Sequence, residues 1–262
     1  MKYTMTSEAK KCIVIANWKM NPQTFAEAKK LFLSIKKKAV TLRNVETVIA
    51  TPFIFLSPLS KLYSGHRIAF SGQDVFWEKK GSFTGEISTS QLKDSGANYV
   101  IVGHSERRAL GEVNDMVHRK VKAVLKEGLT AIVCIGESEH DSHGVYLKFL
   151  REQLSSALVK VKADNLKHII IAYEPLWAIG KTDDEAITPQ MLHETVLFIR
   201  RVLIEMYNKK VAFNTRIIYG GSVEQGNAHA LLVQGKAQGF LVGHAALKAP
   251  EFNHILDIAN RV

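Results

Sequence analysis

The amino-acid sequence predicts an α/β fold in which a single domain forms a parallel (β/α)₈ barrel. Eight short apolar, β-branched runs are spaced along the 262 residues, and helical patterns lie between them. No linker, low-complexity stretch or change of composition marks a second domain. We therefore expect residues 12–262 to form one barrel domain, preceded by a short polar extension at residues 1–11.

The predicted strands read as segments that are buried on both faces, as the strands of a parallel sheet are. They are Cys12–Ala16, Val45–Ala50, Arg67–Ser71, Tyr99–Val102, Thr130–Ile135, His168–Tyr173, Arg216–Tyr219 and Gly239–Val242. A doubly wound open sheet is the alternative. Its first strand is usually followed by a glycine-rich turn, whereas the turn here is Asn17–Asn21, with the sequence NWKMN.

The helices between these strands are indicated by apolar residues at helical spacing. The clearest stripe follows Thr188-Pro189, which predicts an N-cap and a first-turn proline, and consists of Leu192, Val196, Ile199, Leu203 and Met206. A second stripe, closed by Gly128, consists of Val117, Val121, Val124 and Leu125. A third consists of Phe25, Ala28, Phe32, Ile35 and Ala39.

The composition predicts one large core in a cytoplasmic protein. Hydrophobic residues make up 46% of the chain, yet no stretch approaches the roughly 18 uninterrupted apolar residues of a membrane span. Residues 1–11 are polar and lack the apolar core of a secretory signal. Cys12 and Cys134 lie in apolar runs without metal-like spacing, which favours buried thiols over a disulfide or a zinc site.

The net charge of +10 is compatible with nucleic acid, an anionic membrane or a small anionic substrate as partner. Much of the charge lies on the helix predicted around Phe32, where Lys29, Lys30, Lys36 and Lys37 avoid the apolar stripe. A solvated helix face explains this pattern. Because neither interleaved aromatic residues nor a known binding module accompanies it, we expect no nucleic-acid partner and no membrane.

Three of the predicted strands end in residues that can carry out chemistry. Asn17 and Lys19 follow the first strand, His104 follows the fourth, and Glu174 follows the sixth. In a barrel the carboxyl ends of the strands meet at one mouth, so these side chains are expected to converge there. Singly, they could be a surface lysine, a core histidine and half of a structural ion pair. Their joint placement favours a catalytic site.

The last two strands end in glycine instead. Gly220-Gly221-Ser222 follows the seventh strand, and Gly243-His244 follows the eighth. Glycine allows the backbone amides to approach a ligand closely, and barrels often hold a phosphate at these two loops. Tight turns that need glycine are the alternative for either loop alone. Together they favour a phosphate site.

Seven segments in register resemble the triosephosphate isomerase family and span nearly the whole chain. They are Ala16–Asn21 (ANWKMN), Phe83–Ile87 (FTGEI), Val100–Arg108 (VIVGHSERR), Val133–Glu137 (VCIGE), Ala172–Gly180 (AYEPLWAIG), Tyr219–Val223 (YGGSV) and Phe240–Gly243 (FLVG). The resemblance implies the TIM barrel fold. It also implies interconversion of dihydroxyacetone phosphate and glyceraldehyde 3-phosphate through a cis-enediolate, in glycolysis and gluconeogenesis, without a metal or organic cofactor.

The resemblance also implies a role for each strand-end residue. Glu174 would carry the proton between adjacent carbons. His104, kept neutral at a helix N-terminus that begins near Ser105, would hydrogen-bond the enediolate, and Lys19 and Asn17 would bind the substrate oxygens. Triosephosphate isomerase is itself a standard example of a paired base and electrophile, so these roles are carried over by likeness.

By the same resemblance, the amides of Gly180, Ser222 and Gly243 would hold the phosphate, and residues 175–181 would form a lid anchored by Trp177. Two departures from the family pattern affect this region. Lys181 follows Gly180 directly, where the family usually continues Thr-Gly-Lys, so the second hinge of the lid is altered. His244 replaces a second glycine, which adds a Cβ where the backbone is expected to favour positive φ. The amide of His244 is still expected to bind phosphate, and a protonated ring would add a cation.

The long connection Asp74–Glu86 carries Phe76, Trp77 and Phe83, more apolar surface than a free loop usually exposes. It resembles the loop that family members insert into a partner subunit, which implies a homodimer with Thr84 near the partner's site. Packing of this loop on its own barrel is the alternative. For function, the alternatives are an isomerase of another phosphosugar and a catalytically weakened relative that serves as a binding or scaffold protein.

Overall fold

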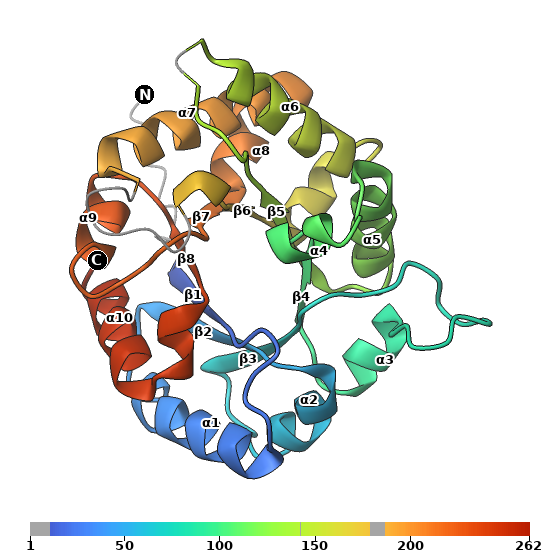
Figure 1. Cartoon of the computed structure of the whole chain (residues 1–262), viewed down its shortest axis with the longest axis vertical. Helices are drawn as coiled ribbons and strands as arrows, with labels where there is room; N and C mark the ends of the chain where they lie inside the picture. Colours follow the sequence, from blue (N-terminus) through green and yellow to red (C-terminus); the bar gives the residue numbers. More distant parts are fainter. Residues whose placement is uncertain (1–10, 142, 179–186) are drawn as a thin grey trace, which may run out of the picture.

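Eight parallel strands close into a barrel, in the order in which they occur in the sequence (Figure 1). The computed structural model describes residues 11–141, 143–178 and 187–262. The strands are β1 (Cys12–Asn17), β2 (Val45–Ala50), β3 (Ile68–Gly72), β4 (Tyr99–Val102), β5 (Thr130–Ile135), β6 (Ile169–Tyr173), β7 (Arg216–Tyr219) and β8 (Gly239–Val242). The predicted (β/α)₈ barrel is confirmed.

Four strand boundaries differ by one residue from those predicted, including both ends of β3, which begins at Ile68 instead of Arg67. Asn17 belongs to β1, where it pairs with Ala50, and Gly72 belongs to β3, where it pairs with Val100. At the other end of a strand, His168 belongs to the 3-10 helix η1 (Ala163–His168), so β6 begins at Ile169. Ladder pairing uses backbone groups, so a strand can continue past its apolar run.

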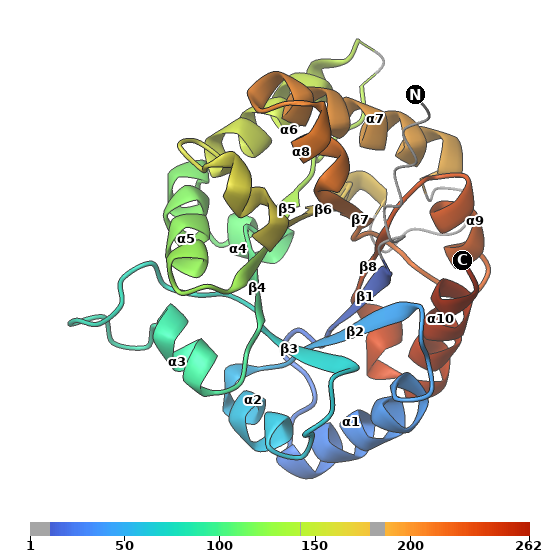
Figure 2. The same ribbon diagram turned by 180° about the vertical axis from the view of Figure 1, so that it is seen from behind.

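Helices surround the barrel on all sides (Figures 1 and 2). They are α1 (Phe25–Ala39), α2 (Phe53–Ser60), α3 (Thr89–Asp94), α4 (Ser105–Ala109), α5 (Asn114–Lys126), α6 (Val145–Ala157), α7 (Pro189–Met206), α8 (Lys209–Asn214), α9 (Ala228–Val233) and α10 (Ala249–Arg261). The predicted N-cap at Thr188 is confirmed, because its side chain accepts a hydrogen bond from Met191 N and Pro189 opens α7. Gly128 closes α5 with a φ of +76°.

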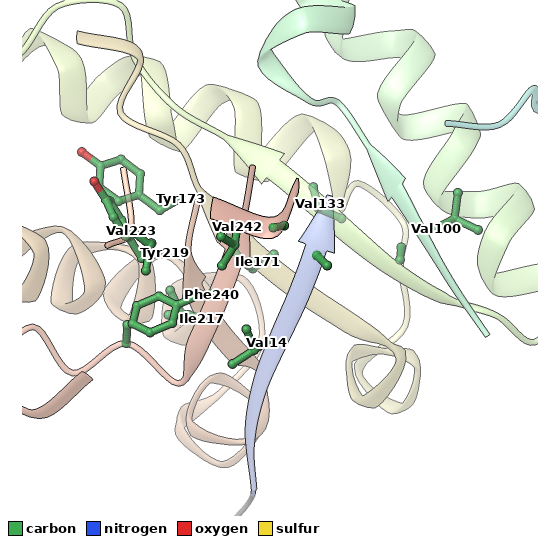
Figure 3. Packing of buried hydrophobic residues seen from close by; sticks show 14 of the residues in the cluster. Val14, Val100, Val133, Ile171, Tyr173, Ile217, Tyr219, Val223, Phe240 and Val242 are labelled. Carbon is green, nitrogen blue, oxygen red and sulfur yellow. The ribbon is translucent and has the colours of Figure 1, made fainter. Parts of the chain in front are cut away.

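The core has two layers that follow from the alternation of side chains along each strand. Ile13 and Ile15 of β1 belong to the cluster inside the barrel, together with residues such as Ile132 of β5. Val14 belongs to the larger cluster between the strands and the helices, with Phe32 of α1. Figure 3 shows the outer residues of several strands in this second layer.

The first and last strands close the ring. β1 pairs with β8 from Ile13 opposite Gly239 to Ala16 opposite Val242. Gly239 has a φ of +152°, and a Cβ at this position would lie 1.9 Å from the carbonyl oxygen of Ile13. Only glycine therefore permits this pairing without a shift of the backbone.

The connection from β3 to α3, which contains residues 74–86, extends away from the barrel (Figures 1 and 2). Near its stem the ring of Phe76 lies 4.2 Å from that of Trp77 and 4.6 Å from that of Phe83. The Arg119 guanidinium of α5 lies 5.5 Å from the Trp77 ring. The stem thus packs on its own barrel, while residues 78–86 are exposed. No helix within the described ranges is long and apolar enough to cross a membrane.

Candidate active site

The side chains predicted at the ends of β1 and β4 lie in one cavity of about 840 Å³. Asn17, Lys19 and His104 line one part of it, and the loops after β7 and β8 line another with Ser222, Gly243 and His244. Glu174 lies just behind this wall and is 2% exposed, in contact with Ser105 and Gly220, which both line the cavity. Gly180 lies outside the described residues.

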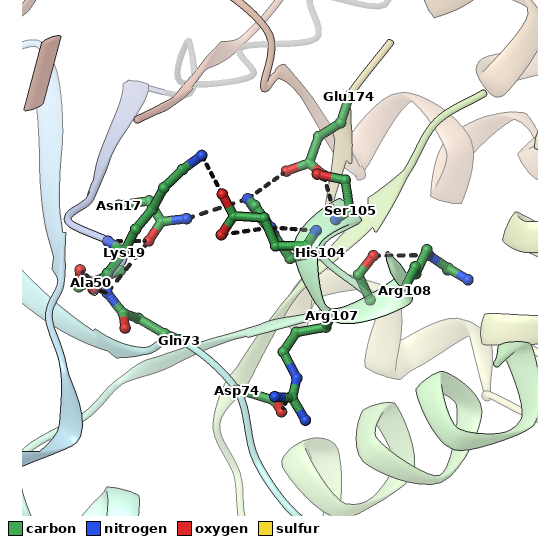
Figure 4. Close-up of polar contacts among 12 residues, drawn as sticks. Asn17, Lys19, Ala50, Gln73, Asp74, His104, Ser105, Arg107, Arg108 and Glu174 are labelled. Carbon is green, nitrogen blue, oxygen red and sulfur yellow. Dashed lines mark hydrogen bonds and ion pairs between the residues drawn. The ribbon is translucent and has the colours of Figure 1, made fainter. Parts of the chain in front are cut away.

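Lys19 has an unusual backbone conformation for a residue with a side chain, with a φ of +53°. Three neighbours hold it. Its N–H donates to Asn17 Oδ1 at 3.1 Å, its carbonyl accepts from Gln73 Nε2 at 2.9 Å, and its Nζ lies 2.6 Å from Glu106 Oε1. Strain of this kind usually persists where function requires a fixed position. The ammonium group is thereby fixed beside the cavity (Figure 4).

His104 forms the N-cap of α4, as the predicted helix start near Ser105 requires. The backbone N–H of Glu106 donates to His104 Nδ1 at 3.2 Å, so Nδ1 carries no proton in this arrangement. The hydrogen of the neutral ring therefore lies on Nε2, which is 3.4 Å from Glu174 Oε1. Asn17 Nδ2 lies 3.3 Å from Nε2, and because the amide nitrogen is itself a donor, it forms no hydrogen bond with Nε2 in this tautomer. Nε2 is the ring atom that can donate a hydrogen bond into the site.

The turn that carries His104 is fixed through both backbone groups of Gly103, whose φ is +72°. Its N–H donates to Glu112 Oε1 at 2.9 Å, and its carbonyl accepts from Arg108 Nε at 2.9 Å. Burial lowers the pKa of Arg108, while Cys134, Glu112 and Glu174 oppose that shift. These contacts position the imidazole relative to the barrel.

Glu174 follows β6, and its two carboxylate oxygens differ in their surroundings. Oε2 accepts a hydrogen bond from Ser105 N at 3.1 Å, whereas Oε1 accepts none within the described part of the chain. A Cβ at Gly220 would lie 2.8 Å from Glu174 Cγ, so glycine leaves room for the side chain. A buried carboxylate with one free oxygen beside an imidazole is suited to accept a proton. Burial raises the pKa of the neighbouring Cys134 thiol, and Glu174 raises it further.

The residue after Gly243 departs from expectation. His244 does not have positive φ, because the described non-glycine residues with positive φ are Lys19, Lys160 and Lys236. It begins the 3-10 helix η4 (His244–Leu247), and its side chain is exposed. The expected backbone conflict of a Cβ at this position is therefore wrong, since the chain turns through Gly243, with φ −92° and ψ −91°.

Glu137 and Gln73 are two polar residues of the site region that the sequence interpretation did not single out. Glu137 is 2% exposed, and its Oε1 accepts from Tyr173 Oη and from Trp177 Nε1, both at 2.8 Å. Burial, followed by Glu137, raises the pKa of Tyr173. Trp177, in the 3-10 helix η2 (Leu176–Ala178), is anchored in this way, and residues 179–186 lie outside the described ranges. Gln73 directly follows β3, and Glu137 lies two residues after the end of β5, so the strand-end rule applied to every strand would have found both.

The described residues contain no group of three or more His, Cys, Asp or Glu side chains arranged to hold a metal ion. The described polar groups of the site are a carboxylate, an imidazole, an ammonium and amides, which suit proton transfer on an anionic substrate.

Comparison with known proteins places the chain in a family. The family model described as triosephosphate isomerase matches residues 12–259. The chain is 40% identical to triosephosphate isomerase of Geotalea uraniireducens over 253 residues, which is 94% of this chain and 98% of that protein. It is 41% identical to the triosephosphate isomerase of Coprinopsis cinerea, over 92% of this chain and 95% of that protein. The crystal structure of triosephosphate isomerase from Bartonella henselae superposes with a TM-score of 0.83 at 34% identity, covering 95% of this chain and 98% of that one. The chain belongs to the triosephosphate isomerase family.

Proposed function

We propose that this chain interconverts dihydroxyacetone phosphate and D-glyceraldehyde 3-phosphate, an aldose–ketose isomerisation of glycolysis and gluconeogenesis. The observation that carries the proposal is the placement of His104 Nε2 3.4 Å from the free oxygen of Glu174, beside a cavity that Lys19 also lines. A catalytically weakened scaffold has no support from the described residues, because all four strand-end groups come together in this region.

In the proposed reaction Glu174 acts as the base. Its carboxylate removes a proton from the carbon next to the carbonyl and returns it to the neighbouring carbon, while the hydroxyl proton of the substrate moves from one oxygen to the other, so there is no net gain or loss of protons. Burial and the free Oε1 support this role, since a general base must reach the proton that it abstracts. Because the step transfers only a proton, it requires no cofactor.

His104 supplies the hydrogen bond to the oxygen on which charge develops. The Glu106 N–H at Nδ1 favours the tautomer with hydrogen on Nε2, and a neutral imidazole is the weaker and therefore better matched acid for an enediolate. The ammonium of Lys19 stabilises the same negative charge, and the Asn17 amide lies 3.3 Å from the ring.

The phosphate is proposed to bind at the loops after β7 and β8, through the amides of Ser222, Gly243 and His244 together with that of Gly180. The first three line the same cavity as Lys19. Ser222 Oγ donates to the carbonyl of Ala178 at 3.2 Å, which links the β7 loop to the proposed lid segment. Such a link supports a phosphate site that lid closure completes.

The active form is proposed to be a cytoplasmic homodimer joined through the Asp74–Glu86 loop, with Thr84 near the partner's site. Large apolar side chains are exposed after each of β1 to β4, which places them in one sector of the barrel mouth. They are Met20 (84% exposed), Ile54 (72%), Phe83 (42%), Leu110 (78%) and Val113 (56%). An apolar surface of this extent is typical of a subunit interface.

Light scattering after size exclusion tests the dimer. We expect twice the 29.3 kDa mass of one chain, and Ile54→Asp is expected to shift the mass toward one chain. Leu197→Asp is the matched control, because Leu197 is 55% exposed on α7, away from these loops. A wild-type mass of one chain would contradict the proposed dimer.

A coupled assay of triose phosphate interconversion with Glu174→Gln tests the catalytic proposal. Loss of the base should lower kcat by about 10² to 10⁴, or about 3–5 kcal/mol of activation free energy, while KM changes only a few-fold. Glu152→Gln, an exposed change on α6, is the matched control. Near-normal turnover of Glu174→Gln would refute the role of this carboxylate.

A further inference from the structure

A second cavity, of about 760 Å³, lies apart from the active site and is not used by the proposed reaction. Three chain segments form its walls: the stem of the long loop at Trp77 and Glu78, the half of α5 from His118 to Lys126, and residues 160–165 before β6. In Figure 2 the yellow segment that precedes β6 lies beside the green helix α5.

The charge of this second cavity is strongly positive. Its lining contains one carboxylate, that of Glu78, and five cationic side chains: Arg119, Lys122, Lys126, Lys160 and Lys162. The active-site cavity differs, because carboxylates line it as well as lysines. Within the described part of the chain, none of the four lysines of the second cavity forms an ion pair.

Several groups in the walls are held in fixed positions. The Trp77 ring is half-buried between Phe76, at 4.2 Å, and the Arg119 guanidinium, at 5.5 Å. Arg119 is oriented by Asp115, whose Oδ2 lies 2.8 Å from Arg119 Nε. On the opposite wall Lys160 has a φ of +57°, a conformation that is costly for a residue with a side chain and that is often found at binding sites.

We propose that this cavity binds a multiply charged phosphate anion, either an inorganic polyphosphate or the triphosphate chain of a nucleotide. The lysines are exposed, and a single exposed ion pair is weak and screened by salt. An anion that contacts only one of these lysines would therefore not stay bound. A chain of phosphates contacts lysines of both walls at once, and the separate contacts then add. Lysine is a common phosphate ligand that acts as a point charge.

Isothermal titration calorimetry of the full chain with tripolyphosphate and with ATP tests this site. Glycerol 3-phosphate is kept at saturation, because it has the phosphate of a triose phosphate but no carbonyl and therefore occupies the active site without reacting. We expect both probes to bind, and the double variant Lys122→Glu/Lys160→Glu to weaken binding by about tenfold or more, since two cations become anions. Tighter binding of ATP that is lost in Trp77→Phe identifies the nucleotide, whereas equal binding identifies the phosphate chain alone.

The matched control is Lys29→Glu/Lys30→Glu on the exposed face of α1, which changes the net charge by the same amount far from the cavity. It should alter the affinity less than about threefold, because exposed charges more than a Debye length away are screened. The isomerase activity of both double variants should equal that of the wild type, which shows that they fold. Absence of binding by both probes, or an equal loss of affinity in the two double variants, would overturn the proposal.

Discussion

Replacing Lys120 of α5 by methionine removes the central cation of a buried ionic cluster. Lys120 is 4% exposed, and its Nζ contacts Glu112 Oε2 and, at 2.6 Å, Asp74 Oδ1. Removal of one partner of a buried pair typically costs about 3–5 kcal/mol, because the remaining charge is left buried and uncompensated. Arg107 Nε remains 2.9 Å from Asp74 Oδ2 and 3.8 Å from Glu112 Oε2, which places the expected loss near the lower end, at about 3 kcal/mol.

Thermal unfolding followed by circular dichroism measures this loss. For a chain of this size about 1 kcal/mol corresponds to about 2–4 °C in Tm, so Lys120→Met should lower Tm by about 6–12 °C. The double variant Lys120→Met/Glu112→Gln should recover part of the loss, because it removes the unpaired buried charge. Lys122→Met is the control, since Lys122 is exposed two residues away and lacks an ion pair within the described ranges. A decrease of less than about 2 °C for Lys120→Met would refute the reasoning.

Three further predictions concern Trp177, the two thiols and His244. Trp177→Phe removes the N–H that donates to buried Glu137 at 2.8 Å. It should lower the free energy of unfolding, measured in urea, by about 1–3 kcal/mol. An unchanged free energy would mean that this hydrogen bond does not stabilise the fold. Burial raises the pKa of the Cys12 thiol from 9.0 to about 12 and that of Cys134 well above its usual value, so thiol reagents at pH 8 should modify neither residue until the chain unfolds. Because folding favours the protonated Cys12, its contribution to stability is present below pH 9 and lost as the pH rises to about 12, and Cys12→Ser should lessen that decline. If a protonated ring of His244 assists phosphate binding, inhibition by glycerol 3-phosphate should strengthen from pH 8 to pH 6 more in the wild type than in His244→Gly, and equal pH dependence would exclude the cation.

The barrel could be predicted from the sequence because its physical causes are local. Each strand is a short run rich in β-branched residues. The strands predicted at Tyr99–Val102 and Thr130–Ile135 have the same bounds in the structure. The convergence of Lys19, His104 and Glu174 followed from one topological rule, since the carboxyl ends of parallel strands meet. Because each of these residues follows the carboxyl end of a parallel strand, their shared location could be predicted without any knowledge of the contacts between them.

The supporting contacts could not be predicted, because they join residues that meet only after the ring closes. The hydrogen bond between Trp177 and Glu137 joins the loop after β6 to the loop after β5. The ion pairs of Lys120 join Glu112 to Asp74, which lies in the connection after β3. From the sequence alone, a charged residue such as Lys120 is expected at the surface. Its burial is possible only because it forms ion pairs with residues from other segments of the chain. The same applies to His244, whose backbone angles depend on how Gly243 turns into η4.

The pairing of β1 with β8 has a consequence for synthesis of this protein on the ribosome. β1 has one edge that only β8 covers, so that edge stays open to other chains until β8 has been synthesised. Closure of the barrel then requires Gly239 of β8 to pair closely with Ile13 of β1. A nascent polypeptide that lacks β8 is therefore expected to expose this edge to chaperones, and a bulkier residue at Gly239 is expected to hinder closure of the barrel after synthesis.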